Sequence, residues 1–139
     1  MATTTATITL SSADLLTDSL SLSATQTLYK AGTTTGIEEY DMGRVVVPAG
    51  GTNLILIDAT AAGNDKAGKV YVTNKNTDET HYVEIRINDS DIGRLYAGDW
   101  MFIPWSQTDV SADIEIKAPN EANTVEYLVF HEGKTFSNA

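Results

Sequence analysis

The chain has 139 residues, no cysteine and a formal net charge of -10, from 19 acidic and 9 basic side chains. This length suits one domain that buries a core without cross-links. The lack of cysteine excludes disulfides and thiolate metal sites. Nucleic acids and acidic membranes are bound mainly through clusters of lysine and arginine, so an acidic chain without such a cluster is expected to bind neither.

Residues 1–36 form a distinct N-terminal segment, rich in threonine and serine, with Lys30 as its one basic residue. It has no basic start followed by an apolar run, so we expect no secretion signal. Polar and apolar residues alternate over residues 5–10 and 19–24, and threonine favours an extended backbone. We therefore expect two strands, joined by a short helical or irregular link that Ser12 could cap.

This segment is expected to be an extended arm that packs either on its own domain or on a neighbouring subunit. Its apolar side chains alternate with hydroxyl side chains, so those of each strand lie on one face. The candidate partner-contact residues of the segment are Ile8, Leu10, Leu20 and Leu22.

Residues 37–139 are expected to form one all-β domain. Apolar and polar residues alternate in short runs, each closed by Asn, Asp, Gly or Pro. These runs are residues 69–74, 81–87, 93–105, 113–118 and 124–132. Residues 53–58 are apolar without alternation, which predicts a central strand buried on both faces. Many short strands and few helices predict an antiparallel β-sandwich or a jelly-roll-like barrel.

The two histidines are the first candidates for metal chemistry. His81 and His131, with Glu84 and Glu132, could make a site of two histidines and two carboxylates. Neither histidine has a second ligand at the short spacing that metal-binding hairpins and helices use. We therefore expect surface strand residues beside turns, with no metal and no cofactor.

Two further segments have a partial likeness to metal sites. Residues 98–104 contain a Gly-Asp turn and a proline, as in cupins, but cupins need an upstream His-x-His pair and a glutamate, and here only His81 precedes. Residues 88–93 alternate carboxylates like a calcium loop, without its distal glutamate. A hairpin turn is the expected role of residues 88–93, with a weak cation site as the alternative. No nucleophile elbow or phosphate-binding glycine loop occurs, so we expect no enzyme.

The aromatic residues lie in or beside the expected strands, where core packing is their commonest role. Trp105 directly follows Pro104 in an expected loop, so it is the best candidate for an exposed partner contact. A carbohydrate- or receptor-binding β-sandwich module is the alternative function, and it would gather Tyr96, Trp100 and Trp105 on one exposed face.

An ordered set of structural motifs covers about half of the chain. They are a strand ending in asparagine, a second strand, a Leu-x-x-Gly-Asp-aromatic strand ending in proline, and a closing pair, at residues 70–74, 82–85, 95–104, 114–118 and 125–129. This order resembles small structural proteins of tailed-phage virions, in particular those of marine and cyanobacterial phages. It is most similar to capsid decoration (cement) proteins, which are small, acidic, all-β and free of cysteine.

The resemblance implies a virion structural protein at the capsid surface. Its partners would be the major capsid protein and further copies of itself, most often as a trimer that clamps neighbouring capsomers. The Thr/Ser-rich start is similar to the extended arms of such proteins. No catalytic or ligand-binding motif belongs to this resemblance, so it assigns no site residue.

Overall fold

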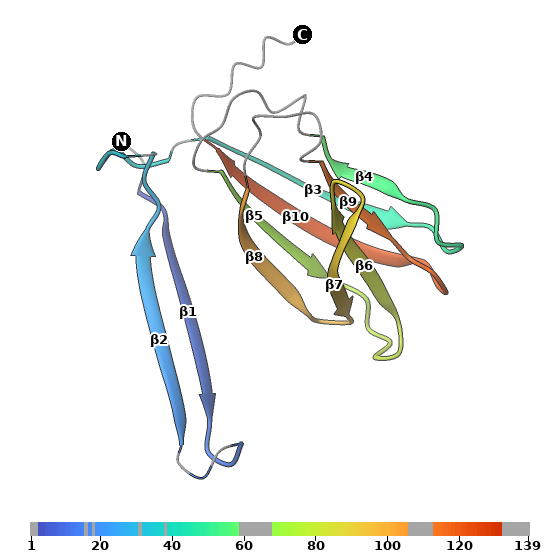
Figure 1. Cartoon of the computed structure of the whole chain (residues 1–139), viewed down its shortest axis with the longest axis horizontal. Helices are drawn as coiled ribbons and strands as arrows, with labels where there is room; N and C mark the ends of the chain where they lie inside the picture. Colours follow the sequence, from blue (N-terminus) through green and yellow to red (C-terminus); the bar gives the residue numbers. More distant parts are fainter. Residues whose placement is uncertain are drawn as a thin grey trace, which may run out of the picture. The chain divides into compact units, whose positions relative to one another are not determined.

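The computed structural model describes residues 3–15, 17, 19–30, 32–37, 39–58, 68–105 and 113–131. These residues form β-strands and no helix (Figure 1). The strands are β1 (Thr5–Ser12), β2 (Leu20–Thr27), β3 (Glu39–Val47), β4 (Leu54–Ile57), β5 (Gly68–Asn74), β6 (Tyr82–Ile87), β7 (Ser90–Tyr96), β8 (Trp100–Trp105), β9 (Ile114–Lys117) and β10 (Asn123–His131). Within this described part, no helix is long and apolar enough to cross a membrane. The chain divides into two compact units, Met1–Glu38 and Glu39–Ala139.

The first unit is an antiparallel hairpin of β1 and β2, paired from Thr5↔Thr27 to Ser12↔Leu20. Ser12 ends β1 and its Oγ accepts hydrogen bonds from the backbone N–H groups of Asp14 (3.4 Å) and Leu15 (3.0 Å). The expected capping contact at Ser12 therefore forms, but it stabilises a bend in the connection and not a helical turn.

The base of the hairpin is closed by backbone hydrogen bonds. The N–H of Leu28 donates to the carbonyl of Thr4 (2.8 Å), and the N–H of Ile37 donates to the carbonyl of Leu28 (3.1 Å). A bridge between Tyr29 and Gly36 joins the two sides of the intervening loop. Leu28 and Ile37 are buried, whereas most side chains of β1 and β2 are exposed.

The second unit contains two four-stranded antiparallel sheets. The first sheet has the order β3-β10-β5-β8, and the second sheet has the order β4-β9-β6-β7 (Figure 1). The strands of the two sheets therefore interleave along the chain, which is the strand order of a double Greek-key jelly roll. The predicted all-β fold, a sandwich or jelly-roll-like barrel, is confirmed.

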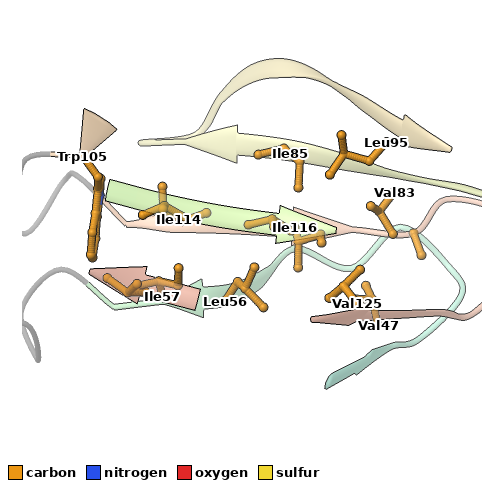
Figure 2. Packing of buried hydrophobic residues seen from close by; sticks show 14 residues of the cluster. Val47, Leu56, Ile57, Val83, Ile85, Leu95, Trp105, Ile114, Ile116 and Val125 are labelled. Carbon is orange, nitrogen blue, oxygen red and sulfur yellow. The ribbon is translucent and has the colours of Figure 1, made fainter. Parts of the chain in front are cut away.

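The core lies between the inner faces of these two sheets (Figure 2). The first sheet contributes valines at alternate positions, as Val70 and Val72 do in β5, where the burial pattern has period two. The second sheet contributes larger aliphatic side chains, among them Ile85, Ile114 and Ile116. Isoleucine and valine suit such strands because their branched Cβ atoms pack well on a pleated surface.

The predicted central position of residues 53–58 is wrong. Strand β4 is short and lies at the edge of the second sheet, paired only with β9 among the described strands. A register shift between Ile55 and Ile57 lets the successive residues Leu56 and Ile57 both turn toward the core. Ile55 is left 52% exposed. The apolar run without alternation reflects this bulge and not burial on both faces.

This placement predicts different outcomes for two isoleucines of neighbouring strands, Ile116 in β9, which is buried, and Ile55 in β4, which is exposed. Ile116→Ala should lower the free energy of unfolding by about 2–5 kcal/mol, because it opens a cavity in the core. Ile55→Ala should change it by less than about 1 kcal/mol, because it removes an exposed edge side chain. Chemical denaturation of both variants measures the difference. Equal losses would show that β4 is covered on both faces.

Candidate interaction surfaces

The environment of His81 is a set of hydrogen bonds within its own loop. Its Nδ1 lies 2.8 Å from the Asn76 side-chain nitrogen, and its Nε2 lies 3.4 Å from a carboxylate oxygen of Asp78. Thr80 donates to Asp78, and these hydrogen bonds lower the pKa of the Asp78 carboxyl below its usual range. The side chain of His131, the last residue of β10, lies outside the described set, as does Glu132.

Residues 88–91 form a tight hairpin turn between β6 and β7. Asn88 and Asp89 both adopt positive φ angles, 51° and 61°, as a two-residue type I′ turn requires. Asp91 Oδ1 accepts a hydrogen bond from Nε of Arg86 at 2.8 Å. The hairpin interpretation of this segment is therefore confirmed. Among the described residues, no group of three or more histidine, aspartate or glutamate side chains could hold a metal.

The Gly-Asp pair that resembles a cupin turn has a backbone role. Gly98 has a φ of 86°, and its N–H donates to the carbonyl of Asn74 (2.9 Å). The Asp99 carboxylate accepts a hydrogen bond from the N–H of Tyr96 (3.0 Å) and so closes the turn between β7 and β8. The carboxylate is used to hold the loop that connects the two sheets.

Two buried asparagines join the sheets at this end of the sandwich. Asn74 donates to the carbonyl of Leu95 (2.9 Å) and to Oδ1 of Asn123 (3.1 Å). Asn123 donates in turn to the carbonyls of Tyr82 (3.3 Å) and Glu121 (2.7 Å). Every donor of both side-chain amides therefore has a partner, which is the condition under which buried amides stabilise a fold.

The aromatic residues fall in different places from those predicted. Trp105 is the last residue of β8 and is 5% exposed, at one end of the row of core side chains in Figure 2. Its predicted exposure is wrong, because it continues the inward alternation of Met101 and Ile103. Tyr96 lies in the second sheet and Trp100 in the first. The trio of exposed aromatics that the alternative, a carbohydrate- or receptor-binding module, would require does not form.

The outer face of the second sheet has the usual character of a solvated surface. Glu84 lies 3.4 Å from the Lys117 ammonium and 3.9 Å from Nε of Arg94. Arg94 also covers the ring of Tyr82, with its guanidinium carbon 4.4 Å from the ring centroid. Charged side chains from adjacent strands pair there with one another.

The outer face of the first sheet is different, and we call it the aromatic face. The registers of β3, β10, β5 and β8 place its residues in rows across the sheet. One row is Tyr40, Phe130, Lys69 and Pro104; the next is Met42, Leu128, Tyr71 and Phe102; the third is Arg44, Glu126, Thr73 and Trp100; and Val46 and Thr124 follow. Most of these side chains are apolar.

The centre of the aromatic face is hollowed. A shallow pocket of about 320 Å³ is lined by residues of β3, β5 and β10, among them Met42, Tyr71 and Leu128. The rings of Tyr71 and Trp100 lie beside it, with centroids 6.3 Å apart. Met42 is 69% exposed. An apolar surface of this kind, on a chain with a net charge of -10, is typical of an interaction site.

One ion pair crosses the aromatic face. Nε of Arg44 donates to a carboxylate oxygen of Glu126 at 2.9 Å, and the Lys75 ammonium lies 3.9 Å from the other oxygen. The hydrogen bonds from Arg44 hold the pKa of the Glu126 carboxyl below its usual value. The face therefore carries no unpaired anion at its centre.

The hairpin has two faces of opposite character. The register of β1 and β2 brings the predicted contact residues Ile8, Leu10, Leu20 and Leu22 together on one face. Threonines and serines occupy the opposite face, where the hydroxyls of Thr7 and Thr25 lie 3.1 Å apart. Neither strand contains a charged residue.

The aromatic face was missed at the level of sequence. Its signal is present in β10, where Val125 and Val129 face the core while Leu128 and Phe130 face outward. A strand that is apolar on both sides of a sheet indicates a second buried face. The pattern in β10 alone does not reveal the whole surface, because the strands that pair with β10 are β3 and β5, which are far away in sequence.

The hydrogen bonds of Asn74 and Asn123 predict that removal of one of these side-chain amides lowers the free energy of unfolding. Asn123→Ala should lower the free energy of unfolding by about 1–3 kcal/mol for each buried group that it leaves unpaired. Glu121→Ala is the control, because it keeps the carbonyl that Asn123 contacts, and surface changes of this kind stay within about 0.5 kcal/mol. Chemical denaturation compares the two. Equal stability of both variants would contradict a structural role for the network.

The ion pair between Arg44 and Glu126 is expected to weaken in acid. The pKa of Glu126 is lowered in the fold, so the stability that the pair contributes is present at neutral pH and is lost as pH falls through that pKa. Arg44→Gln should raise the pKa of Glu126, and Arg94→Gln should leave it unchanged. Carboxyl carbon NMR during an acid titration measures both. An unchanged pKa in Arg44→Gln would contradict the assigned cause.

No family model, curated protein or solved structure matches this chain. Its function is therefore argued from its own surfaces, the hairpin and the aromatic face.

Proposed function

We propose that this protein is a virion structural protein, a capsid decoration (cement) protein that binds and stabilises the shell of the major capsid protein. It works on the capsid surface as a homo-oligomer, most simply a trimer. The observation that carries the proposal is the hairpin: its two strands contain no charged residue, one of its faces is apolar and exposed, and none of its residues belongs to the core cluster of the sandwich.

The hairpin is a poor candidate for an independent structure. Two strands alone are marginally stable in water, because neither face of the ribbon is covered. Leu10 and Leu22 pair directly across the strands, and both are about half exposed. Their burial requires another surface, so the hairpin gains most of its stability when it is bound.

The sandwich supports a binding role and gives no support to a catalytic one. Its described carboxylates at Asp91, Asp99 and Glu115 accept hydrogen bonds from Arg86 or from backbone N–H groups of turns. Jelly rolls occur in viral capsid proteins, lectin domains and cupins, so the fold is compatible with the proposal but does not select it. The acidic surface keeps unassembled copies apart and suits a basic partner surface.

A carbohydrate- or receptor-binding module is the second candidate. The observation that favours it is the pair of rings formed by Tyr71, which is half-buried and lines the shallow pocket, and Trp100, which is exposed. Aromatic rings of this kind can stack on the faces of sugars. Glycan-array binding that is lost in Trp100→Ala, with a monomeric protein, would favour this candidate over the structural one.

Removal of the hairpin tests the proposed function. A chain without residues 1–37 should remain folded, because the core cluster lies wholly within residues 39–139, but it should lose both self-assembly and binding to the cognate capsid. Light scattering after size exclusion measures the first, and co-sedimentation with capsids measures the second. Thermal melting confirms that the truncated chain still folds.

Two results would contradict the proposal. Unfolding of the truncated chain would make the hairpin an integral part of one domain. An intact chain that is monomeric and has no affinity for the capsid would exclude the decoration role and leave the carbohydrate-binding candidate.

A further inference from the structure

We propose that the aromatic face is the docking site for the apolar face of the hairpin from a second copy of the chain. This inference deepens the proposed function, because it rests on self-assembly and names the two surfaces that would carry it. Each copy presents one donor surface, the hairpin, and one acceptor surface, the aromatic face.

Both surfaces are apolar and exposed in the single chain. On the acceptor, Tyr40 is 58% exposed and Met42 is more exposed still; on the donor, Leu22 is 49% exposed. The pocket at the centre of the acceptor is lined by Met42, Tyr71, Tyr127 and Leu128, with the paired Arg44 and Glu126 beside them, and its volume of about 320 Å³ exceeds that of a leucine side chain. Leu10 and Leu22 lie together at the centre of one face of the hairpin, where such side chains are needed.

Charge favours the hairpin over other parts of a second copy as the occupant of the aromatic face. The chain carries a net charge of -10, so the approach of two sandwiches is opposed by repulsion. The hairpin strands contain no charged residue, and the charged residues of the aromatic face are Arg44, Lys69 and Glu126. Docking through β1 and β2 therefore brings no anion of these strands against Glu126 of the other copy.

The dimensions of the two surfaces match. Eight residues of extended strand span about 26 Å, and a two-stranded ribbon is about 10 Å wide. The aromatic face is about 19 Å across its four strands and about 23 Å along β3 from Tyr40 to Val46. The hairpin can therefore cover about half of the aromatic face, along the row that contains Met42, Tyr71 and Leu128.

The area argues for a closed assembly. One such contact covers on the order of 500 Å² in total, well below the roughly 1,200 Å² of a stable specific interface. A closed ring gives every copy two contacts, one as donor and one as acceptor, and so doubles the area per subunit. A trimer formed in this way fits the proposed function.

Cysteine pairing tests the contact, since the chain has no cysteine of its own. The variants Leu22→Cys and Met42→Cys, carried on copies of different size and co-expressed, should form a mixed disulfide on mild oxidation. Ser21→Cys replaces Leu22→Cys as the donor control, because it lies on the hydroxyl face of the hairpin. Ile92→Cys replaces Met42→Cys as the acceptor control, because it is exposed on the second sheet.

The expected result is at least ten times more mixed disulfide from Leu22→Cys with Met42→Cys than from either control pair. A yield no higher than the controls would overturn the inference. A disulfide that forms only when both cysteines are on one chain would also overturn it, because the occupant would then be the chain's own hairpin.

A second pair of variants separates this inference from the proposed function. Met42→Asp should dissociate the oligomer, whereas Ile92→Asp, at a similarly exposed residue of the second sheet, should not. If Met42→Asp still assembles and binds capsids, the aromatic face is not the docking site although the proposed function stands. If the unmodified chain neither assembles nor binds capsids, the proposed function itself fails.

Discussion

Burial of the two inner sheet faces against each other is the interaction on which the rest of the sandwich depends. Each strand has side chains on two faces, and the core takes one face from each of eight strands. The core fixes where each strand lies. The turns, which contain glycine and asparagine, connect strand ends whose positions are already set. The paired asparagines add direct hydrogen bonds between the sheets, so the two layers cannot slide without breaking buried contacts.

The outer faces of the two sheets take no part in the core, so their side chains can differ in character. The second sheet uses its outer face for ion pairs between neighbouring strands, at Glu84 with Lys117 and Arg94. The first sheet places tyrosine, methionine, leucine and tryptophan in the equivalent positions. Such side chains gain nothing from solvent exposure, because the favourable free energy of an apolar side chain comes from its removal from water. Of the two outer faces, that of the first sheet is therefore the one that would gain more free energy from being covered.

The fold class could be predicted because alternation with period two, closed by turn residues, runs through most strands. The Asn88–Asp89 turn was also predictable, since both residue types tolerate positive φ angles. Strand order was not, because partners such as β3 and β10 are far apart in sequence. The two errors share one cause. Ile55 and Trp105 were placed by their local sequence, whereas a bulge in β4 and the continuation of the alternation of β8 through Pro104 decide which way they face.

The uncharged composition of β1 and β2 has a consequence for the response to ionic strength. Salt weakens contacts that depend on attraction between opposite charges, because counterions screen them. The two strands of the hairpin offer no charge to screen, while the repulsion between acidic sandwiches is reduced by the same counterions. Apolar contacts are also strengthened by salts that are excluded from protein surfaces. The proposed association through these strands would therefore become tighter, not weaker, as the salt concentration rises.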